Sequence, residues 1–282
     1  MERRGEPSLL SETYTLLRRY GVKPRWRLGQ SFMLDTGLLD RMVAYAEVTS
    51  GDTVLEVGAG LGYLTKRLAE RAGQVIAVEI EPRLVQALNA QLEGWGNVSI
   101  IQGDFRKATL PAFNKVVSNP PYSASSDLVL SLLNRRLDQA VLTFQDEFAE
   151  KLLASPGTPH YGRLSVAAGL KWLVEPLEHV GRSAFYPAPK VDSTLVMLRP
   201  RGKPLKVPDW RRFLELVTFL FSQRRRRVRK ALGVYLARRP EAAGIIRHLS
   251  DLPYGDLRVH ELPLAGFVLL ANLLEDRLKD ET

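Results

Sequence analysis

The sequence predicts an α/β fold, in which a largely parallel sheet is followed by a small C-terminal all-helical domain. From residue 53 onward, short β-rich runs alternate with helical segments, a pattern typical of a parallel sheet covered by helices on both faces. Pro200, Gly202, Pro204 and Pro208 mark a linker. Beyond it, apolar residues recur three and four positions apart, as they do in helices. We therefore expect two domains, residues 1–200 and residues 201–282.

The elements are justified in chain order by composition and periodicity. Residues 1–52 indicate helical pieces around a loop at Lys23–Gln30. Four β-rich runs are expected to be strands, at Thr53–Val57, Gln74–Glu79, Val98–Ile101 and Lys115–Ser118, with helices at Tyr63–Ala72 and Pro82–Leu92. Later apolar runs bring the expected number of strands to about seven, at Ala140–Phe144, Leu164–Val174 and Ser193–Leu198. The C-terminal helices are expected at Trp210–Leu220, Arg225–Leu236 and Leu262–Leu278.

Composition excludes several classes of protein and site. With 45% hydrophobic and 25% charged residues the chain is of ordinary globular type. No apolar run approaches the roughly 18 residues of a membrane span, and the N-terminus has no signal-peptide core, so we expect a cytoplasmic protein without a membrane partner. The absence of cysteine excludes disulfides, iron–sulfur clusters and cysteine nucleophiles. The four histidines are not at ligand spacing, and we expect no metal site.

Charge is concentrated in the last third of the chain. Residues 201–282 hold 17 basic and 10 acidic residues, whereas residues 1–200 have a surplus of only two positive charges. Such asymmetry favours a nucleic-acid partner, although it can also serve solubility. Between Leu216 and Pro240 there are eight basic residues and no acidic one, and residues 13–34 hold five basic residues and no acid. We expect these stretches to bind phosphates rather than form only a solvated face. In the second domain the phosphate contacts are expected from Arg224, Arg225, Arg226 and Arg227 at a helix start, with Arg229 and Lys230.

A glycine loop follows the first β-rich run. Gly58, Gly60 and Gly62 allow close approach of the backbone to a ligand, although a tight turn would use the same residues. A dinucleotide fingerprint starting at Gly58 requires glycine where Tyr63 stands, which makes NAD the less favoured ligand. A nucleoside without a pyrophosphate fits this spacing better.

Acidic residues end the next two strands. Glu79 lies 21 residues after Gly58, where a carboxylate can accept hydrogen bonds from both ribose hydroxyls. Asp104 can accept a hydrogen bond from an adenine amino group, or can serve as a turn or helix-cap residue. Because parallel strands present their carboxyl ends at one edge, these groups should meet there. Together they resemble the cofactor site of S-adenosylmethionine-dependent methyltransferases.

The segment after the fourth strand, Ser118–Tyr122, suits an amino-group acceptor. An amino nitrogen conjugated to a purine is a poor nucleophile, so hydrogen-bond acceptors must localise its lone pair. Asn119 offers a side-chain carbonyl, and Pro120 a backbone carbonyl stiffened by its own ring and by that of Pro121. Tyr122 offers an aromatic face for the base. A rigid proline turn is the alternative interpretation.

Several longer segments resemble the small-subunit ribosomal RNA adenine N6,N6-dimethyltransferase family. Besides Asn-Pro-Pro-Tyr, they are Arg27–Asp35, Phe144–Leu153, Tyr161–Ser165, Phe185–Ser193 and Phe221–Lys230, within a similarity that covers Arg25 to Leu274. The resemblance implies a Rossmann-like, seven-stranded methyltransferase sheet in residues 1–200 and a basic RNA-binding domain in residues 201–282. It also implies dimethylation of two adjacent adenines near the 3′ end of small-subunit ribosomal RNA during ribosome biogenesis. The implied target is the immature small subunit, and we expect a monomer.

The resemblance also implies roles for individual residues. Contacts to S-adenosylmethionine would come from Gln30, Ser31, Met33, Gly58, Gly60, Glu79, Ile80, Asp104, Phe105 and Asn119. Phe185 would help to hold the target base, unless it is a core aromatic. The chain departs from the family pattern at Ser31, where asparagine is usual, and at Pro120, where leucine is frequent; the backbone carbonyl of Pro120 is retained.

Two other functions remain possible from the sequence. One is methylation of adenine in large-subunit ribosomal RNA, the activity that confers macrolide resistance. The long basic tail and the Phe185–Ser193 segment favour the small-subunit interpretation. The other is a noncatalytic ribosome-assembly or transcription factor with a retained fold, against which intact Glu79, Asp104 and Asn119 argue.

Overall fold

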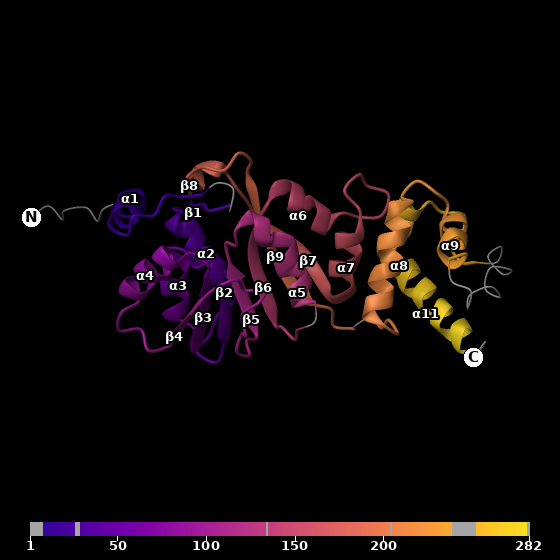
Figure 1. The fold of residues 1–282 in the computed structure, drawn as a ribbon, viewed down its shortest axis with the longest axis horizontal. Coiled ribbons are helices and arrows are strands. Elements are labelled where there is room, and N and C mark those ends of the chain that lie inside the picture. The colour runs from indigo at the N-terminus through magenta and orange to yellow at the C-terminus, as the bar shows by residue number, and fades with distance from the viewer. Residues whose placement is uncertain (1–7, 26–28, 134, 204, 239–251, 281–282) are drawn as a thin grey trace, which may run out of the picture. The chain divides into compact units, whose positions relative to one another are not determined.

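A mixed sheet runs through the first part of the chain (Figure 1). The computed structural model describes residues 8–25, 29–133, 135–203, 205–238 and 252–280. Within them, seven strands form one sheet in the order β4-β3-β2-β5-β6-β9-β7. Their bounds are β2 (Thr53–Val57), β3 (Gln74–Glu79), β4 (Val98–Gln102), β5 (Lys115–Ser118), β6 (Gln139–Gln145), β7 (Trp172–Val180) and β9 (Ser193–Pro200). The predicted α/β class and the seven-stranded sheet are confirmed.

The first five strands in the spatial order of the sheet, β4-β3-β2-β5-β6, are parallel. β2 pairs with β3 and β5, β3 with β4, and β5 with β6 in parallel register, whereas β9 is antiparallel to β6. A separate antiparallel pair joins β1 (Phe32–Met33) to β8 (Phe185–Tyr186), with Phe32 opposite Tyr186. This small pair brings two segments that are far apart in sequence together.

Helices follow most of the strands. They are α1 (Leu9–Arg19), α2 (Thr36–Tyr45), α3 (Tyr63–Ala69), α4 (Pro82–Gln91), α5 (Ser125–Leu132), α6 (Asp146–Leu153), α7 (Arg163–Lys171), α8 (Trp210–Ser222), α9 (Val228–Leu236) and α11 (Leu264–Asp280). Single 3-10 turns lie at η2 (Tyr122–Ala124), η3 (Arg182–Ala184) and η6 (Val259–Glu261). Capping fixes several starts: Asp35 accepts a hydrogen bond from Leu38 N (2.9 Å), and Asp209 accepts one from Arg212 N (2.8 Å).

The strand predicted at Leu164–Val174 is wrong over most of its length. Residues 163–171 form helix α7, and the strand begins only at Trp172. Ser165 stabilises the start of this helix, because its Oγ accepts a hydrogen bond from Gly162 N (3.0 Å) and donates one to Lys151 O (2.6 Å). Val166, Ala167 and Ala168 are all buried. A helix that is buried on several sides has no polar stripe, so its apolar run cannot be distinguished from a strand.

Three strands of the sheet, β3, β5 and β6, are buried on both faces. Consecutive residues of β3, β5 and β6 are inaccessible, which is why these strands have no polar alternation in the sequence. On one face, Leu38 and Met42 of α2 and Leu68 of α3 join Val54 and Val75 in the main core. Burial of such side chains contributes about 1.5–3 kcal/mol each.

The chain divides into two compact units. One contains residues 1–149 and 175–200, and the other contains residues 150–174 and 201–282. Residues 150–174 join the second unit because Tyr161 and Leu170 share a buried cluster with Phe213 of α8, Leu232 of α9 and Phe267 of α11. The predicted boundary at residue 201 thus corresponds to one of three chain crossings between the units. No helix in the described ranges is both long and apolar enough to cross a membrane.

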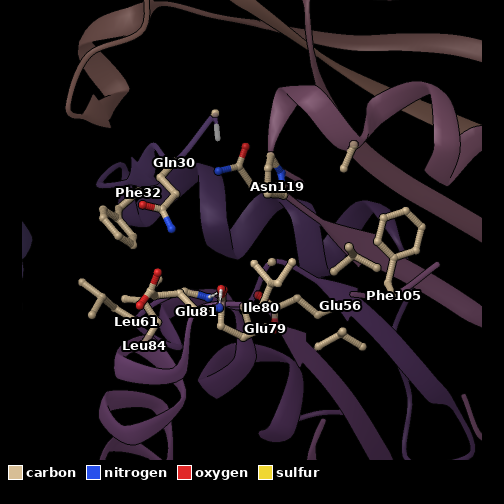
Figure 2. A pocket seen from close by; sticks show the side chains of 18 of the residues that line it. Gln30, Phe32, Glu56, Leu61, Glu79, Ile80, Glu81, Leu84, Phe105 and Asn119 are labelled. Carbon is tan, nitrogen blue, oxygen red and sulfur yellow. Dashed lines mark hydrogen bonds between the residues drawn. The ribbon is translucent and has the colours of Figure 1, made fainter. Parts of the chain in front are cut away.

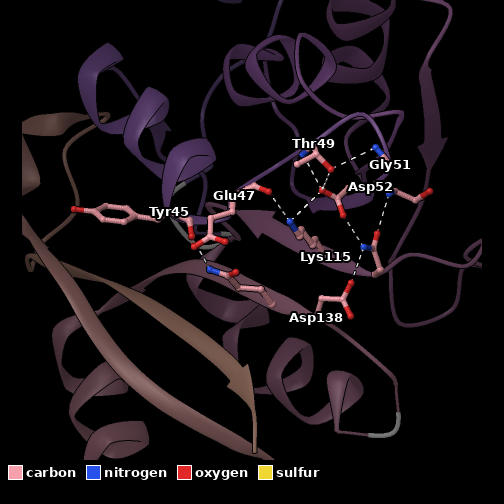
Figure 3. A network of polar contacts seen from close by, with 10 residues as sticks. Tyr45, Glu47, Thr49, Gly51, Asp52, Lys115 and Asp138 are labelled. Carbon is pink, nitrogen blue, oxygen red and sulfur yellow. Dashed lines mark hydrogen bonds and ion pairs between the residues drawn. The ribbon is translucent and has the colours of Figure 1, made fainter. Parts of the chain in front are cut away.

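A polar network holds the amino ends of the central strands together (Figure 3). Just before β2, Asp52 forms a buried ion pair with Lys115 of β5 (3.0 Å), whose Nζ also donates to Glu47 O (2.6 Å). Burial alone would raise the pKa of Asp52, but hydrogen bonds from Asn114, Thr49 and Lys115 lower it to about 2. The network stabilises this end of the sheet.

Candidate active site

A cavity of about 530 Å³ lies at the carboxyl ends of β2 to β5, the edge at which parallel sheets bind ligands. Figure 2 shows Asn119 and Gln30 on one side of this space and Glu79 and Glu81 on the other. The lining includes all ten residues assigned above to the cofactor: Gln30, Ser31, Met33, Gly58, Gly60, Glu79, Ile80, Asp104, Phe105 and Asn119.

Two glycines allow the loops around the cavity to pack closely. Gly58 has φ +81°, and a Cβ there would lie 2.7 Å from Cδ of Pro121. Gly29 has φ +69°, and its Cβ would lie 2.8 Å from the backbone nitrogen of Tyr122. Any larger residue at either position would meet both backbone strain and a clash. The Asn-Pro-Pro-Tyr loop is therefore packed directly against two segments that line the cofactor cavity.

Glu79 is a buried carboxylate at the end of β3, with 5% of its surface exposed. Its two oxygens accept hydrogen bonds from Gly60 N and from Glu81 N, both at 2.9 Å. Burial raises the pKa of Glu79, although these backbone hydrogen bonds oppose the shift. Each carboxylate oxygen can accept a second hydrogen bond. Glu79 thus both shapes the glycine loop and retains acceptor capacity on the cavity side.

Asp104 is held by its neighbour Arg106. The Arg106 guanidinium donates to both carboxylate oxygens, at 2.6–3.0 Å, and its Nη1 also donates to Asp127 of α5 (2.9 Å). The Arg106 hydrogen bonds hold the pKa of Asp104 near 2, so Asp104 is ionised at neutral pH. Asp104 also accepts a hydrogen bond from the backbone N of Arg106 (3.0 Å). It is a turn residue that also lines the cavity, and so combines the two roles weighed from the sequence.

The side-chain amide of Asn119 has a defined orientation. Its Nδ2 donates to the backbone oxygen of Ser31 (3.2 Å), and Oγ of Ser31 donates to the backbone oxygen of Pro187 (2.7 Å). With the amide nitrogen used in this way, Oδ1 of Asn119 is the atom available to accept a hydrogen bond from a substrate. Ser31 connects the acceptor motif to the segment after β8.

Three residues predicted for the acceptor site do not line the cavity. Pro120 is buried and is not part of the cavity wall, whereas Pro121 lines the cavity. The hydroxyl group of Tyr122 lies 2.8 Å from Oγ of Ser193, and burial raises the Tyr122 pKa. Phe185 is 3% exposed and packs in the main core, opposite Met33 in the β1–β8 pair.

Sequence reasoning missed several residues of the cavity wall, including Phe32, Glu56, Glu81 and Arg106. Glu56 is the most unusual, since burial raises its pKa to about 8 and only one hydrogen bond, from Oγ1 of Thr65 (2.6 Å), opposes this. The available signal was a glutamate inside the otherwise apolar run Thr53–Val57. An ionisable residue in a buried strand favours a functional role.

The arginine cluster of the second unit lies mainly in the turn before helix α9, and Arg227 is the N-cap of that helix. Residues 223–226 form a turn, and helix α9 begins at Val228, three residues later than predicted. Arg224 cannot be a free phosphate ligand, because its guanidinium donates to the backbone oxygens of Tyr161, Thr158 (2.7 Å) and Pro159 (2.8 Å).

The other basic residues of the cluster differ in their partners. Arg227 and Arg229 pair with Asp256, at 3.2 and 2.9 Å. Arg225, Arg226 and Lys230 are exposed. Arg239 and Pro240, at the end of the predicted basic stretch, and Arg27, in the N-terminal one, lie outside the described residues.

One further group has the composition of a metal site. Potential ligand atoms of Asp146, His179 and Asp192 lie within 4.8 Å of one another, and Nε2 of His179 is 3.6 Å from an oxygen of each aspartate. All three side chains are at least one third exposed. Histidine spacing could not have indicated this group, since two of its members are aspartates from other segments.

Comparisons with known proteins cover most of the chain. Residues 21–252 match the family described as "Ribosomal RNA adenine dimethylase". A "Probable ribosomal RNA small subunit methyltransferase A" of Methanosarcina mazei is 39% identical over 93% of this chain and 97% of its own length. The protein of the same name from Thermococcus onnurineus is 40% identical, over 88% and 92%.

Two solved structures are similar as well. A dimethyladenosine transferase from Plasmodium falciparum has a TM-score of 0.79 and 28% identity, and the match covers 87% of this chain and 98% of that one. The 23S rRNA methyltransferase ErmE has a TM-score of 0.64 and 30% identity, with coverage of 88% and 99%.

Proposed function

This chain belongs to the ribosomal RNA adenine dimethylase family, and we propose that it dimethylates the N6 amino groups of two adjacent adenines near the 3′ end of small-subunit ribosomal RNA. Asn119 carries the proposal: its amide nitrogen is held by Ser31 O, so its carbonyl oxygen is presented to a cavity that also contains the buried carboxylate of Glu79.

The cavity residues fit S-adenosylmethionine, which when bound supplies an electrophilic methyl group on a sulfonium ion. Glu79 would accept hydrogen bonds from the ribose hydroxyls, using the acceptor capacity left by its two backbone donors. Asp104 would accept a hydrogen bond from the adenine amino group. The adenine ring would lie between Phe105 and the exposed side chain of Ile80. The carboxylates around the cavity favour a cationic ligand. Gln30, Ser31, Met33, Gly58 and Gly60 would complete its surroundings.

The acceptor side would act by hydrogen bonding rather than by strong-base catalysis. Oδ1 of Asn119 and the backbone oxygen of Pro120 would each accept one N6–H of the target adenine, which localises the nitrogen lone pair. Once a methyl group is added the nitrogen is cationic, and its proton is then lost to water without a dedicated base. Pro121 packs on Gly58 and fixes the loop, and Tyr122 would stack on the base. Phe185, buried beneath, would position this face from the core.

The comparisons favour small-subunit RNA as the substrate. The curated relatives of 39–40% identity carry small-subunit names, and the TM-score is higher for the dimethyladenosine transferase than for the 23S rRNA enzyme. A noncatalytic factor would not need the oriented Asn119 amide or the buried Glu79. We further propose that the protein acts as a cytoplasmic monomer on the immature small subunit.

We propose a division of labour between residues 1–200, which would bind cofactor and target base, and residues 201–282, which would bind RNA. The exposed Arg225, Arg226 and Lys230 are the best candidates for phosphate contacts. Arg224 would act indirectly, because its guanidinium binds the 158–161 loop and so holds in place the turn that carries Arg225 and Arg226. Arg227 and Arg229 would need to exchange Asp256 for phosphate.

The direct test is methylation of immature small subunits with labelled S-adenosylmethionine, followed by mass spectrometry of the digested RNA. The parent protein should produce dimethyladenine at two adjacent positions. Asn119→Ala should reduce the rate about 10²–10³-fold, the usual cost of removing one preorganised polar contact, while RNA binding persists. Asn89→Ala, which alters an exposed asparagine of α4, is the matched control.

Two results would contradict the proposal in different ways. Full dimethylation by Asn119→Ala would refute the acceptor mechanism. Absence of methylation by the parent on any adenine substrate would favour the assembly-factor alternative.

A further inference from the structure

A second cavity of about 860 Å³ lies beside α1 in the first unit, outside the site described above. Its wall combines two tyrosines with three cations: Tyr14, Arg18 and Arg19 of α1, Lys23 in the following loop, and Tyr186 of β8. We propose that this groove, the α1 groove, binds the RNA nucleotides that flank the target adenine. The inference deepens the proposed function, because it assumes that the substrate of the neighbouring site is RNA.

The charge of the α1 groove suits a phosphate backbone. Arg18, Arg19 and Lys23 are exposed, and no carboxylate belongs to the part of the groove wall that the structure describes. The acid of α1, Glu12, instead accepts a hydrogen bond from Gln91 of α4 (3.1 Å). Favourable placement at the helix C-terminus could account for Arg18 and Arg19. It cannot account for Lys23, which lies beyond the helix and borders the same groove.

The two tyrosines form an aromatic pair in which Tyr14 is exposed and Tyr186 is half-buried. Tyr14 and Tyr186 have ring centroids 4.7 Å apart at an interplanar angle of 61°, and Tyr14 is 51% exposed. The core does not require Tyr14, because α1 packs into it through the buried Leu16 and Leu17. Exposed rings next to cations are the usual arrangement for unpaired nucleotides, since any base can stack on a π-face while its phosphate is neutralised.

The α1 groove is connected to the acceptor amide by three short links. Tyr186 pairs with Phe32 in the β1–β8 ladder. The adjacent residues continue the connection, since Oγ of Ser31, which precedes Phe32, donates to the backbone oxygen of Pro187, which follows Tyr186 (2.7 Å). Ser31 O in turn accepts from Nδ2 of Asn119 (3.2 Å). An RNA strand with one base flipped toward Asn119 would therefore carry its neighbouring nucleotides past Tyr186.

The test measures RNA binding by the full-length protein, with protein-free small-subunit RNA and with intact immature subunits. Tyr14→Ala should weaken RNA binding about 5- to 150-fold, the range for loss of one stacked base, and Tyr14→Phe should restore it. Arg18→Gln/Arg19→Gln/Lys23→Gln should lower the slope of log K against log salt by roughly 2, because each phosphate contact contributes about 0.7.

The matched control, Arg71→Gln/Arg136→Gln/Arg199→Gln, removes the same charge from exposed positions of the same unit outside the groove. It should leave both affinity and slope nearly unchanged. Affinity for S-adenosylmethionine should be unchanged in all these variants. A 4-thiouridine placed next to the target adenines should also crosslink to α1 in the parent protein.

The outcomes separate this proposal from the proposed function. If both groove variants bind RNA with the affinity and salt slope of the parent, the proposal for the α1 groove is wrong, whereas the proposed methylation is unaffected. Weaker binding to subunits with unchanged binding to protein-free RNA would assign the groove to a ribosomal protein and overturn it too. If the groove variants lose RNA affinity although the parent makes no methyladenine, the groove stands and the proposed function fails.

Discussion

Replacing Glu79 with glutamine tests the cofactor site with the smallest change of shape. In the parent, the carboxylate accepts hydrogen bonds from Gly60 N and Glu81 N, and it retains acceptor capacity because a carboxylate offers about four acceptor sites. Glutamine retains one carbonyl oxygen but presents an NH₂ group to the other backbone donor. One charge-assisted hydrogen bond to the ribose should be lost, which costs about 1.5–3 kcal/mol.

This loss corresponds to roughly 10- to 150-fold weaker binding of S-adenosylmethionine. Isothermal titration calorimetry measures it directly, and S-adenosylhomocysteine should show the same loss. Stability should change little, because glutamine removes a buried charge as well as a backbone hydrogen bond. Glu70→Gln, an exposed glutamate just after α3, is the control. Unchanged affinity in a folded Glu79→Gln variant would remove Glu79 from the cofactor site.

Three further predictions follow from charge and burial. Burial raises the pKa of Glu56 to about 8, so the free energy of unfolding should fall as pH rises from about 4.5 to 8, and Glu56→Gln should abolish that dependence in denaturant titrations. The pKa of Asp52, lowered to about 2, implies about 2 kcal/mol of stability that is lost as pH falls from about 4 to 2; Asp52→Asn should therefore differ from the parent at pH 7 and converge with it near pH 2. In filter binding, Arg225→Gln/Arg226→Gln should reduce the salt slope by about 1.4–1.8, whereas a parent slope would identify a solvated face.

Burial explains which elements could be predicted from the sequence. β3, β5 and β6 are short and buried on both faces, so their apolar runs stand out between turn residues. The run Leu164–Val174 failed because α7 is buried on several sides, and small residues such as Ala167 and Ala168 remove the polar stripe of a helix. Tertiary contacts, such as those of Tyr161 and Leu170 with the C-terminal helices, place this region in the second unit, and no local pattern reveals them.

The parts of the candidate site that could be predicted are those in which a particular residue type at a fixed spacing is needed for one kind of contact. Glycines, a strand-end acid and an asparagine before two prolines all lie on the predicted cavity wall. The ion pair of Asp104 with Arg106 was not predictable, because nothing local distinguishes that arginine from a solvated one. The same holds for Arg224, whose partners lie 63 to 66 residues away.

The segment from Gly29 to Met33 is the physical connection between the cofactor cavity, the acceptor motif and the α1 groove. Gly29 packs on the backbone of Tyr122, Ser31 holds the Asn119 amide, and Phe32 pairs with Tyr186. The orientation of Asn119 thus depends on Ser31, which directly precedes β1. β1 in turn pairs with β8, and β8 carries Tyr186 of the α1 groove. Displacement of β8 would move Pro187 away from Ser31 Oγ, and so would loosen the backbone that fixes the amide. Binding of RNA in the α1 groove should therefore hold β8 and β1 together and fix the orientation of the amide that we propose activates the target nitrogen. Loss of Tyr14 should then lower kcat as well as raise KM for RNA.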